Sequence, residues 1–131
     1  MILRVWRAKI VPERVGEYRR FNREQSLPML RKQPGFLGVL FSWAARDCTT
    51  ISVTIWEDVG ALQALQSSPS YRKTTRRLAE SGLLASEKPV ELLEVEGGEL
   101  RPEALVGALT QTLARTRRTG SSSSSAADSF D

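Results

Sequence analysis

The stretch from Ile51 to Tyr71 constrains the fold of this chain more than any other part of the sequence. It begins with alternating, β-branched residues that are typical of a strand. After Trp56 and Glu57, Asp58 is a good N-cap for a helix over residues 59–66, because its carboxylate can accept a hydrogen bond from a free backbone N–H of the first turn. Pro69 then begins a second helical segment that runs to about residue 80. The stretch therefore predicts a strand, a tight turn and two successive helices.

The N-terminal third predicts another strand followed by a helix. Residues 2–11 alternate with a period of two, which places Arg4 and Trp6 on the same face of a strand. Pro12 ends this strand, and helical spacing follows until Pro34-Gly35 stops it. Pro28 lies inside the helical segment, so we expect it to kink or restart the helix.

The predicted elements follow the order β-α-β-β-α-β over residues 1–96, because further strands are expected at residues 36–43, 49–56 and 90–96. This order is typical of an α+β fold of the ferredoxin-like type, with a four-stranded antiparallel sheet and both helices on one face. The other face would keep apolar side chains from several strands. Such a face needs a partner, and we expect a homodimer formed by packing sheet against sheet.

The sequence changes character after residue 96. We expect a linker and an amphipathic C-terminal helix over residues 97–118, followed by a disordered, Ser-rich tail over residues 119–131. The helix either docks on the domain or on the other subunit, or it contacts a membrane surface or a protein partner.

Composition excludes several classes of function. The 131 residues contain no histidine, which excludes Ser-His-Asp and Cys-His catalysis, proximal-histidine haem ligation and histidine-based metal sites. The single cysteine, Cys48, cannot form an intrachain disulfide, as is usual in a reducing compartment. The net charge of +4 is spread over several helices without the interleaved aromatic residues of an RNA-binding strand, so we expect no nucleic-acid partner. No segment is apolar enough to span a membrane, and a cytoplasmic location is expected.

Four short motifs occur in a characteristic order: PGFLG at residues 34–38, IWED at 55–58, ALQAL at 61–65 and SPSY at 68–71. Their order and spacing resemble those of the antibiotic biosynthesis monooxygenase (ABM) domain. The resemblance covers residues 1–96. It implies a dimeric α+β barrel in which a functional pocket lies between each sheet and its own helices.

One branch of that family degrades haem. It uses an asparagine, a tryptophan and a histidine at the positions that spacing assigns to Trp6, Leu65 and Thr75 of this sequence. All three residues differ, so the resemblance argues against haem degradation here.

Another branch oxidises aromatic phenols to quinones with molecular oxygen and without metal or flavin. The resemblance therefore implies a cofactor-independent monooxygenase that acts on a small aromatic phenol or quinol in an apolar cavity with aromatic walls. Arg4 would stabilise a phenolate or peroxide anion, and Asn22 would orient a hydroxyl group. The candidate catalytic residues are Arg4, Asn22 and Tyr71, and the candidate substrate-binding residues are Trp6, Tyr18, Phe21 and Leu65.

Each candidate has a structural alternative. Trp6, Phe21 and Tyr71 have the character of core residues, and Arg4 would be neutralised by a carboxylate on the last strand, Glu91 or Glu94. A non-catalytic dimer that binds a ligand or assembles with a partner is the alternative function. An open cavity that contains Arg4 and a tyrosine favours the enzyme, whereas an interior closed by aromatic side chains favours the binding module.

Overall fold

The computed structural model describes residues 1–119, and these residues belong to two units. The first unit is Met1–Val95, and the second begins at Glu96. The second unit contains helix α5 (Pro102–Thr119), which has the exposed apolar residues Leu105, Val106, Leu109 and Leu113. The tail expected to be disordered lies outside the described residues except for Thr119, the last residue of α5. Among the described helices, none has the length and apolar character needed to cross a membrane.

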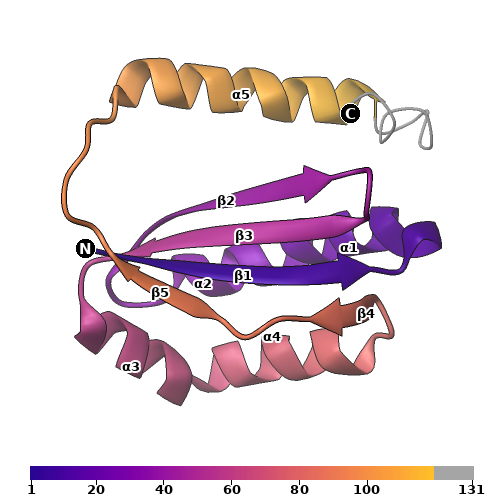
Figure 1. The fold of residues 1–131 in the computed structure, drawn as a ribbon, viewed down its shortest axis with the longest axis horizontal. Helices are drawn as coiled ribbons and strands as arrows, with labels where there is room; N and C mark the ends of the chain where they lie inside the picture. The colour runs from indigo at the N-terminus through magenta and orange to yellow at the C-terminus, as the bar shows by residue number, and fades with distance from the viewer. Residues whose placement is uncertain (120–131) are drawn as a thin grey trace. The chain divides into compact units, whose positions relative to one another are not determined.

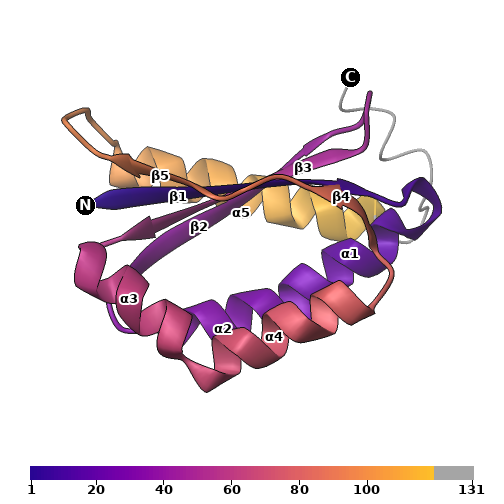
Figure 2. The ribbon, with the colours of Figure 1, turned by 60° about the horizontal axis from the view of Figure 1, so that its bottom comes forward.

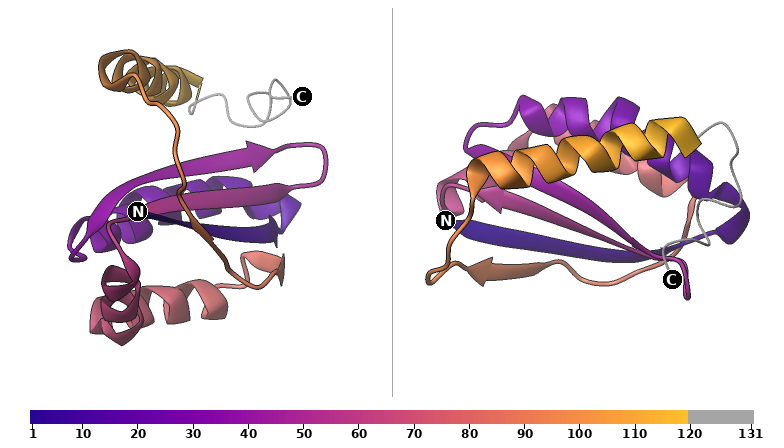
Figure 3. Two further views of the ribbon diagram at one scale, coloured as in Figure 1. Left: turned by 60° about the vertical axis from the view of Figure 1, so that its left-hand side comes forward. Right: turned by 90° about the horizontal axis from the view of Figure 1, so that it is seen from above.

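The first unit is built on an antiparallel sheet in the order β2-β3-β1-β4, with β5 also paired to β1 (Figures 1 and 3). The five strands are β1 (Ile2–Ile10), β2 (Phe36–Ala44), β3 (Thr49–Trp56), β4 (Leu84–Glu87) and β5 (Glu91–Glu94). Directly opposed residues share a face of the sheet, so the register fixes which side chains face the helices. Arg4, for example, lies between Thr54 of β3 and Leu92 of β5.

The fourth position of the sheet is occupied by two short strands, whereas the sequence predicted one strand at residues 90–96. Both β4 and β5 pair with β1, and Pro89 lies between them. Val5 pairs with Glu91 and Ala8 pairs with Glu87, so two β1 residues face three residues of the edge. This is a β-bulge, and it accommodates a proline that has no N–H to donate to the ladder.

The helices of the first unit lie on one face of the sheet (Figure 2). They are α1 (Val15–Phe21), α2 (Leu27–Arg31), α3 (Val59–Ser67) and α4 (Pro69–Glu80). A π-helical turn, Asn22–Ser26, joins α1 to α2, with the N–H of Leu27 donating to the carbonyl of Asn22. Pro28 follows directly and has no N–H to donate, so the expected irregularity appears as a widened turn just before the proline.

Side-chain caps and glycines define the helix ends. The Asp58 carboxylate accepts a 2.9 Å hydrogen bond from the N–H of Ala61, as its predicted N-cap role requires, and Ser68 caps α4 in the same way. Gly35 and Gly82, which follow α2 and α4, both have φ of +76°, a left-handed conformation that favours glycine.

The interior between sheet and helices contains two apolar clusters. The larger cluster consists of Ile2, Met29, Leu30, Trp56, Ala61, Leu62 and Leu65. The smaller one consists of Ile10, Tyr18 and Leu83, with Trp6, Phe21 and Trp43 packed against it. Trp56 is completely buried, and its indole N–H donates to the Thr54 hydroxyl at 2.8 Å. The first unit therefore has the expected α+β, ferredoxin-like fold, with its helices on one face of an antiparallel sheet.

Candidate functional site

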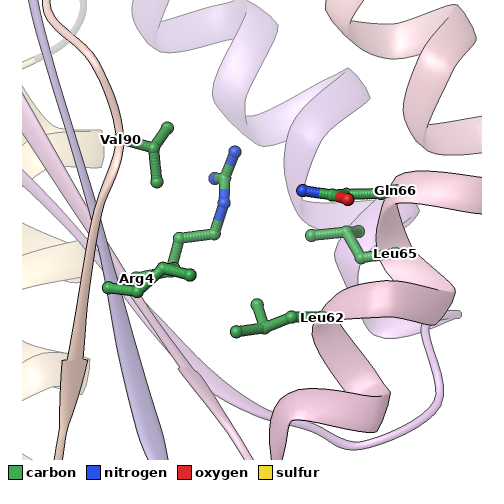
Figure 4. A pocket seen from close by; sticks show the side chains of 6 residues that line it. Arg4, Leu62, Leu65, Gln66 and Val90 are labelled. Atoms are coloured by element: carbon green, nitrogen blue, oxygen red, sulfur yellow. The ribbon is translucent and has the colours of Figure 1, made fainter.

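A cavity of about 230 Å³ lies in the first unit, beside helix α3 and the strand β1 (Figure 4). We call it the inner cavity. Its lining residues come from three segments: Arg4 from β1, Leu62, Leu65 and Gln66 from α3, and Val90 and Leu92 from the edge of the sheet. Apart from Arg4 and Gln66 this lining is aliphatic, so a single charged group is presented to an apolar space.

Arg4 points away from the sheet because alternation in β1 places it on the helix-facing side. Its Nη2 atom donates a 2.8 Å hydrogen bond to the hydroxyl of Tyr71, which lies in the first turn of α4. The guanidinium carbon is 5.7 Å from the centre of the Tyr71 ring, which adds a cation–π contact. Figure 4 shows the guanidinium extending toward the helices, with Val90 on one side and Gln66 on the other.

Arg4 forms no ion pair within residues 1–115, whose side chains the structure describes. Neither carboxylate named as an alternative partner of Arg4 pairs with it: Glu91 lies on the opposite face and contacts Arg7 at 3.6 Å, and Glu94 forms no ion pair with Arg4. A half-buried cation without a counter-charge is unfavourable, and an anionic ligand would relieve that cost. The electrostatics of the inner cavity therefore favour an anion.

The other predicted site residues lie elsewhere. Trp6, Tyr18 and Phe21 belong to the smaller apolar cluster, where the rings of Trp6 and Tyr18 stack with centroids 6.4 Å apart. The indole N–H of Trp6 donates to Glu87 at 2.7 Å. Asn22 is buried in the π-helical turn and is not among the residues that line the cavity. Of the seven candidates, the structure thus brings together Arg4, Tyr71 and Leu65.

Sequence reasoning missed the contribution of Val90, Leu92 and Gln66. Val90 follows Pro89 at the bulge, and bulges often occur where a side chain is aimed toward a site. Pro89, directly before the strand predicted at residues 90–96, was the available signal, because proline in a sheet is restricted to edges, strand starts and bulges. Leu62, Leu65 and Gln66 recur at the spacing of one helix face, which a helical count along α3 could have found.

A second cavity of about 330 Å³ adjoins the first, and we call it the outer cavity. It is lined by Ile2, Val59, Leu62, Gln63, Gln66, Leu92 and Glu94. Leu62, Gln66 and Leu92 line both cavities, so the two spaces are neighbours along α3.

The described residues contain no group of acidic or cysteine side chains able to hold a metal ion. The chemistry that the arrangement offers is instead a cation, a phenol hydroxyl and an aliphatic wall. Such a set can bind and orient an apolar molecule that carries one anionic or acidic oxygen.

Neither a family model nor a curated protein matches this sequence. Solved structures with a similar fold include SnoaB from Streptomyces nogalater, described as a cofactor-independent oxygenase, at 16% identity and a TM-score of 0.61. The match covers 76% of this chain and 97% of SnoaB. Rv0793 from Mycobacterium tuberculosis matches at 18% identity and a TM-score of 0.57, over 76% of this chain and 98% of that one.

A structure described as an antibiotic biosynthesis monooxygenase matches at 14% identity and a TM-score of 0.57, over 76% of this chain and 100% of its own. Sequence identities of 14–18% show that this chain and these structures share a fold. The chain therefore has the fold of the antibiotic biosynthesis monooxygenase proteins, the family that its sequence motifs resemble.

Proposed function

We propose that this protein is a cofactor-independent monooxygenase that oxidises a small aromatic phenol or quinol with molecular oxygen. The observation that carries the proposal is the guanidinium of Arg4, which faces an apolar cavity, is hydrogen-bonded to Tyr71, and has no carboxylate partner among the described side chains. The fold that the chain shares with a cofactor-independent oxygenase supports the same assignment.

In the proposed reaction, Arg4 stabilises the phenolate form of the substrate through charge-assisted hydrogen bonds. The phenolate passes one electron to oxygen, and the resulting pair combines at a ring carbon to give a hydroperoxide. Loss of water from this hydroperoxide gives the quinone. One oxygen atom of O₂ enters the product, the other leaves as water, and the substrate supplies all four electrons. The aliphatic side chains of the lining offer water no hydrogen-bonding partner beside the reactive intermediates.

Oxygen uptake with a panel of anthrone-like and hydroquinone substrates tests this proposal. Arg4→Gln should lower kcat by about 100-fold or more, the size expected when a stabilising donor for a developing anion is removed. Arg7→Gln is the matched control, because Arg7 lies on the same strand with its side chain on the opposite face. Absence of uptake above buffer across the panel, with the wild-type protein folded, would refute the proposal.

A non-catalytic ligand-binding module is the second candidate. The observation that favours it is that Trp6 and Tyr18 stack on each other in the smaller apolar cluster, so that neither is among the described residues that line the inner cavity. Binding of an aromatic anion without any oxygen uptake would identify this function.

We also propose that the protein is a cytoplasmic homodimer that packs sheet against sheet into an α+β barrel. The register places Leu3, Val5, Leu40, Val53 and Ile55 on the face opposite the helices. This row is apolar, and Leu40 is 43% exposed. Light scattering at micromolar concentration should give twice the chain mass, and Val53→Glu should reduce it to the mass of one chain. A stable wild-type monomer would overturn the dimer.

A further inference from the structure

The inner and outer cavities differ in charge, and this difference bears on the shape and polarity of the ligand. Arg4 lines only the inner cavity, and Glu94 lines only the outer one. The residues that line both, Leu62, Gln66 and Leu92, carry no charge. A molecule that occupies both spaces therefore meets a cation at one end, an uncharged middle and a carboxylate at the other end.

The register sets the distance between the two ends. Leu92 pairs with Arg4 and Glu94 pairs with Ile2, so the cavities are offset by two residues along β1, or about 6–7 Å. On α3, Leu65 lines only the inner cavity, whereas Val59 and Gln63, two to six residues nearer the N-terminus, line only the outer one, an offset of about 3–9 Å along the helix. This offset corresponds to a ligand body of about two fused rings rather than one.

The size of the inner cavity supports a ligand that extends beyond it. Ligand sites usually enclose about 300–1,000 Å³, and the inner cavity holds only about 230 Å³. Leu92 is 56% exposed and Val90 is 38% exposed, so the sheet edge leaves the space accessible from solvent.

We infer that the site takes an elongated, apolar monoanion whose anionic group binds Arg4 and whose far end, beside Glu94, is uncharged or positively charged. The inference rests on the proposed function in that it concerns the same cavity, and it adds the length and charge polarity of the ligand. Glu94 acts as a specificity determinant, because it repels a second anionic group at the far end of the molecule.

Two non-oxidisable probes test the inference by isothermal titration calorimetry: 2-naphthoate, with one carboxylate, and naphthalene-2,6-dicarboxylate, with one at each end. The wild-type protein should bind the monoanion more tightly than the dianion. Arg4→Gln should weaken 2-naphthoate binding by about 10- to 100-fold, the range expected for a charge-assisted hydrogen bond. Glu94→Gln should improve binding of the dianion by about two- to fivefold while leaving the monoanion unchanged.

Glu91→Gln and Arg7→Gln are the matched controls, because both residues lie on the same strands as Glu94 and Arg4 but on the opposite face. Neither should change the affinity for either probe, and thermal melts of all variants establish that they are folded. The inference is overturned if the wild-type protein does not bind 2-naphthoate, if Arg4→Gln leaves binding unchanged, or if Glu94→Gln leaves the preference for the monoanion unaltered. Because neither probe can be oxidised, binding that follows this pattern supports the inference even where oxygen uptake fails.

Discussion

Gly35 is the position at which a single added methyl group should damage this fold most. Its φ of +76° is left-handed, and a Cβ built on it would lie 2.5 Å from the Cβ of Ala61 in α3. Its carbonyl also accepts a 2.9 Å hydrogen bond from the N–H of Glu57, just before that helix. Gly35→Ala therefore combines backbone strain with a clash against a helix that lines both cavities.

The two penalties can be estimated separately. A non-glycine residue in the left-handed region costs about 1–2 kcal/mol, and overpacking of a close contact costs about 1–3 kcal/mol. Gly35→Ala should therefore lower the free energy of unfolding by about 2–5 kcal/mol. For a domain of this size that corresponds to a fall in Tm of roughly 10 °C or more, which thermal and urea denaturation followed by circular dichroism would measure.

Gly82→Ala separates the cost of backbone strain from the cost of the clash with Ala61. Gly82 has the same φ of +76°, but an added Cβ would meet only the end of the flexible Arg14 side chain, at 3.0 Å. It should therefore cost only the strain, about 1–2 kcal/mol. Adding Ala61→Gly to Gly35→Ala removes the clashing Cβ and should recover part of the loss. Equal costs for the two single variants, or no recovery in the double variant, would refute the assignment of the extra cost to Ala61.

Three further outcomes are expected. The hydrogen bond from Arg14 holds the pKa of Glu17 below its ordinary value. Glu17→Gln should therefore be less stable than the wild-type protein at neutral pH, and this difference in stability should disappear as pH falls through the lowered pKa. A difference in stability that persists at lower pH would contradict this. Asp58→Ala should cost about 1 kcal/mol in urea denaturation, because the N–H of Ala61 loses its acceptor, whereas an unchanged midpoint would show that the cap contributes nothing. Leu65→Ala should lower the free energy of unfolding by about 2–5 kcal/mol, because Leu65 is 1% exposed and belongs to the larger apolar cluster. Saturating 2-naphthoate should restore part of the lost thermal stability. A loss below about 1 kcal/mol would show that the surrounding side chains fill the space without penalty.

The fold could be predicted because its signals are local. Alternation in residues 2–10, the stop at Pro34-Gly35 and the cap at Asp58 each depend on a few neighbouring residues, and they agree with one another. The division of the last strand into β4 and β5 was harder to predict from the sequence. It depends on which residues of β1 lie opposite Pro89 in the sheet. The register between two strands that are distant in sequence cannot be predicted from either strand alone.

The site was predictable only in part for a similar reason. Period-two alternation placed Arg4 and Trp6 on the same face of the strand, and the structure shows that this face is the one toward the helices. It did not distinguish their surroundings, because the two residues are close in sequence but contact different helices. Arg4 reaches Tyr71 in α4, whereas Trp6 stacks on Tyr18 in α1. Which side of the interior stays open depends on the volumes of side chains brought together by tertiary packing, and a single strand pattern does not contain that information.

The bulge at Pro89 gives the inner cavity two walls of unequal stiffness. Helix α3 and β1 are held by continuous backbone hydrogen bonds, but no β1 residue pairs with Pro89 or Val90 in the described structure. Val90 can therefore swing outward without breaking a ladder bond, at a lower free energy than global unfolding. The amide of Val90 should exchange with deuterium faster than that of Leu92, and a bound ligand should slow it. The interruption at Pro89 thus makes Val90 the part of the inner cavity's lining with the fewest backbone restraints, on the side where the sheet edge is exposed.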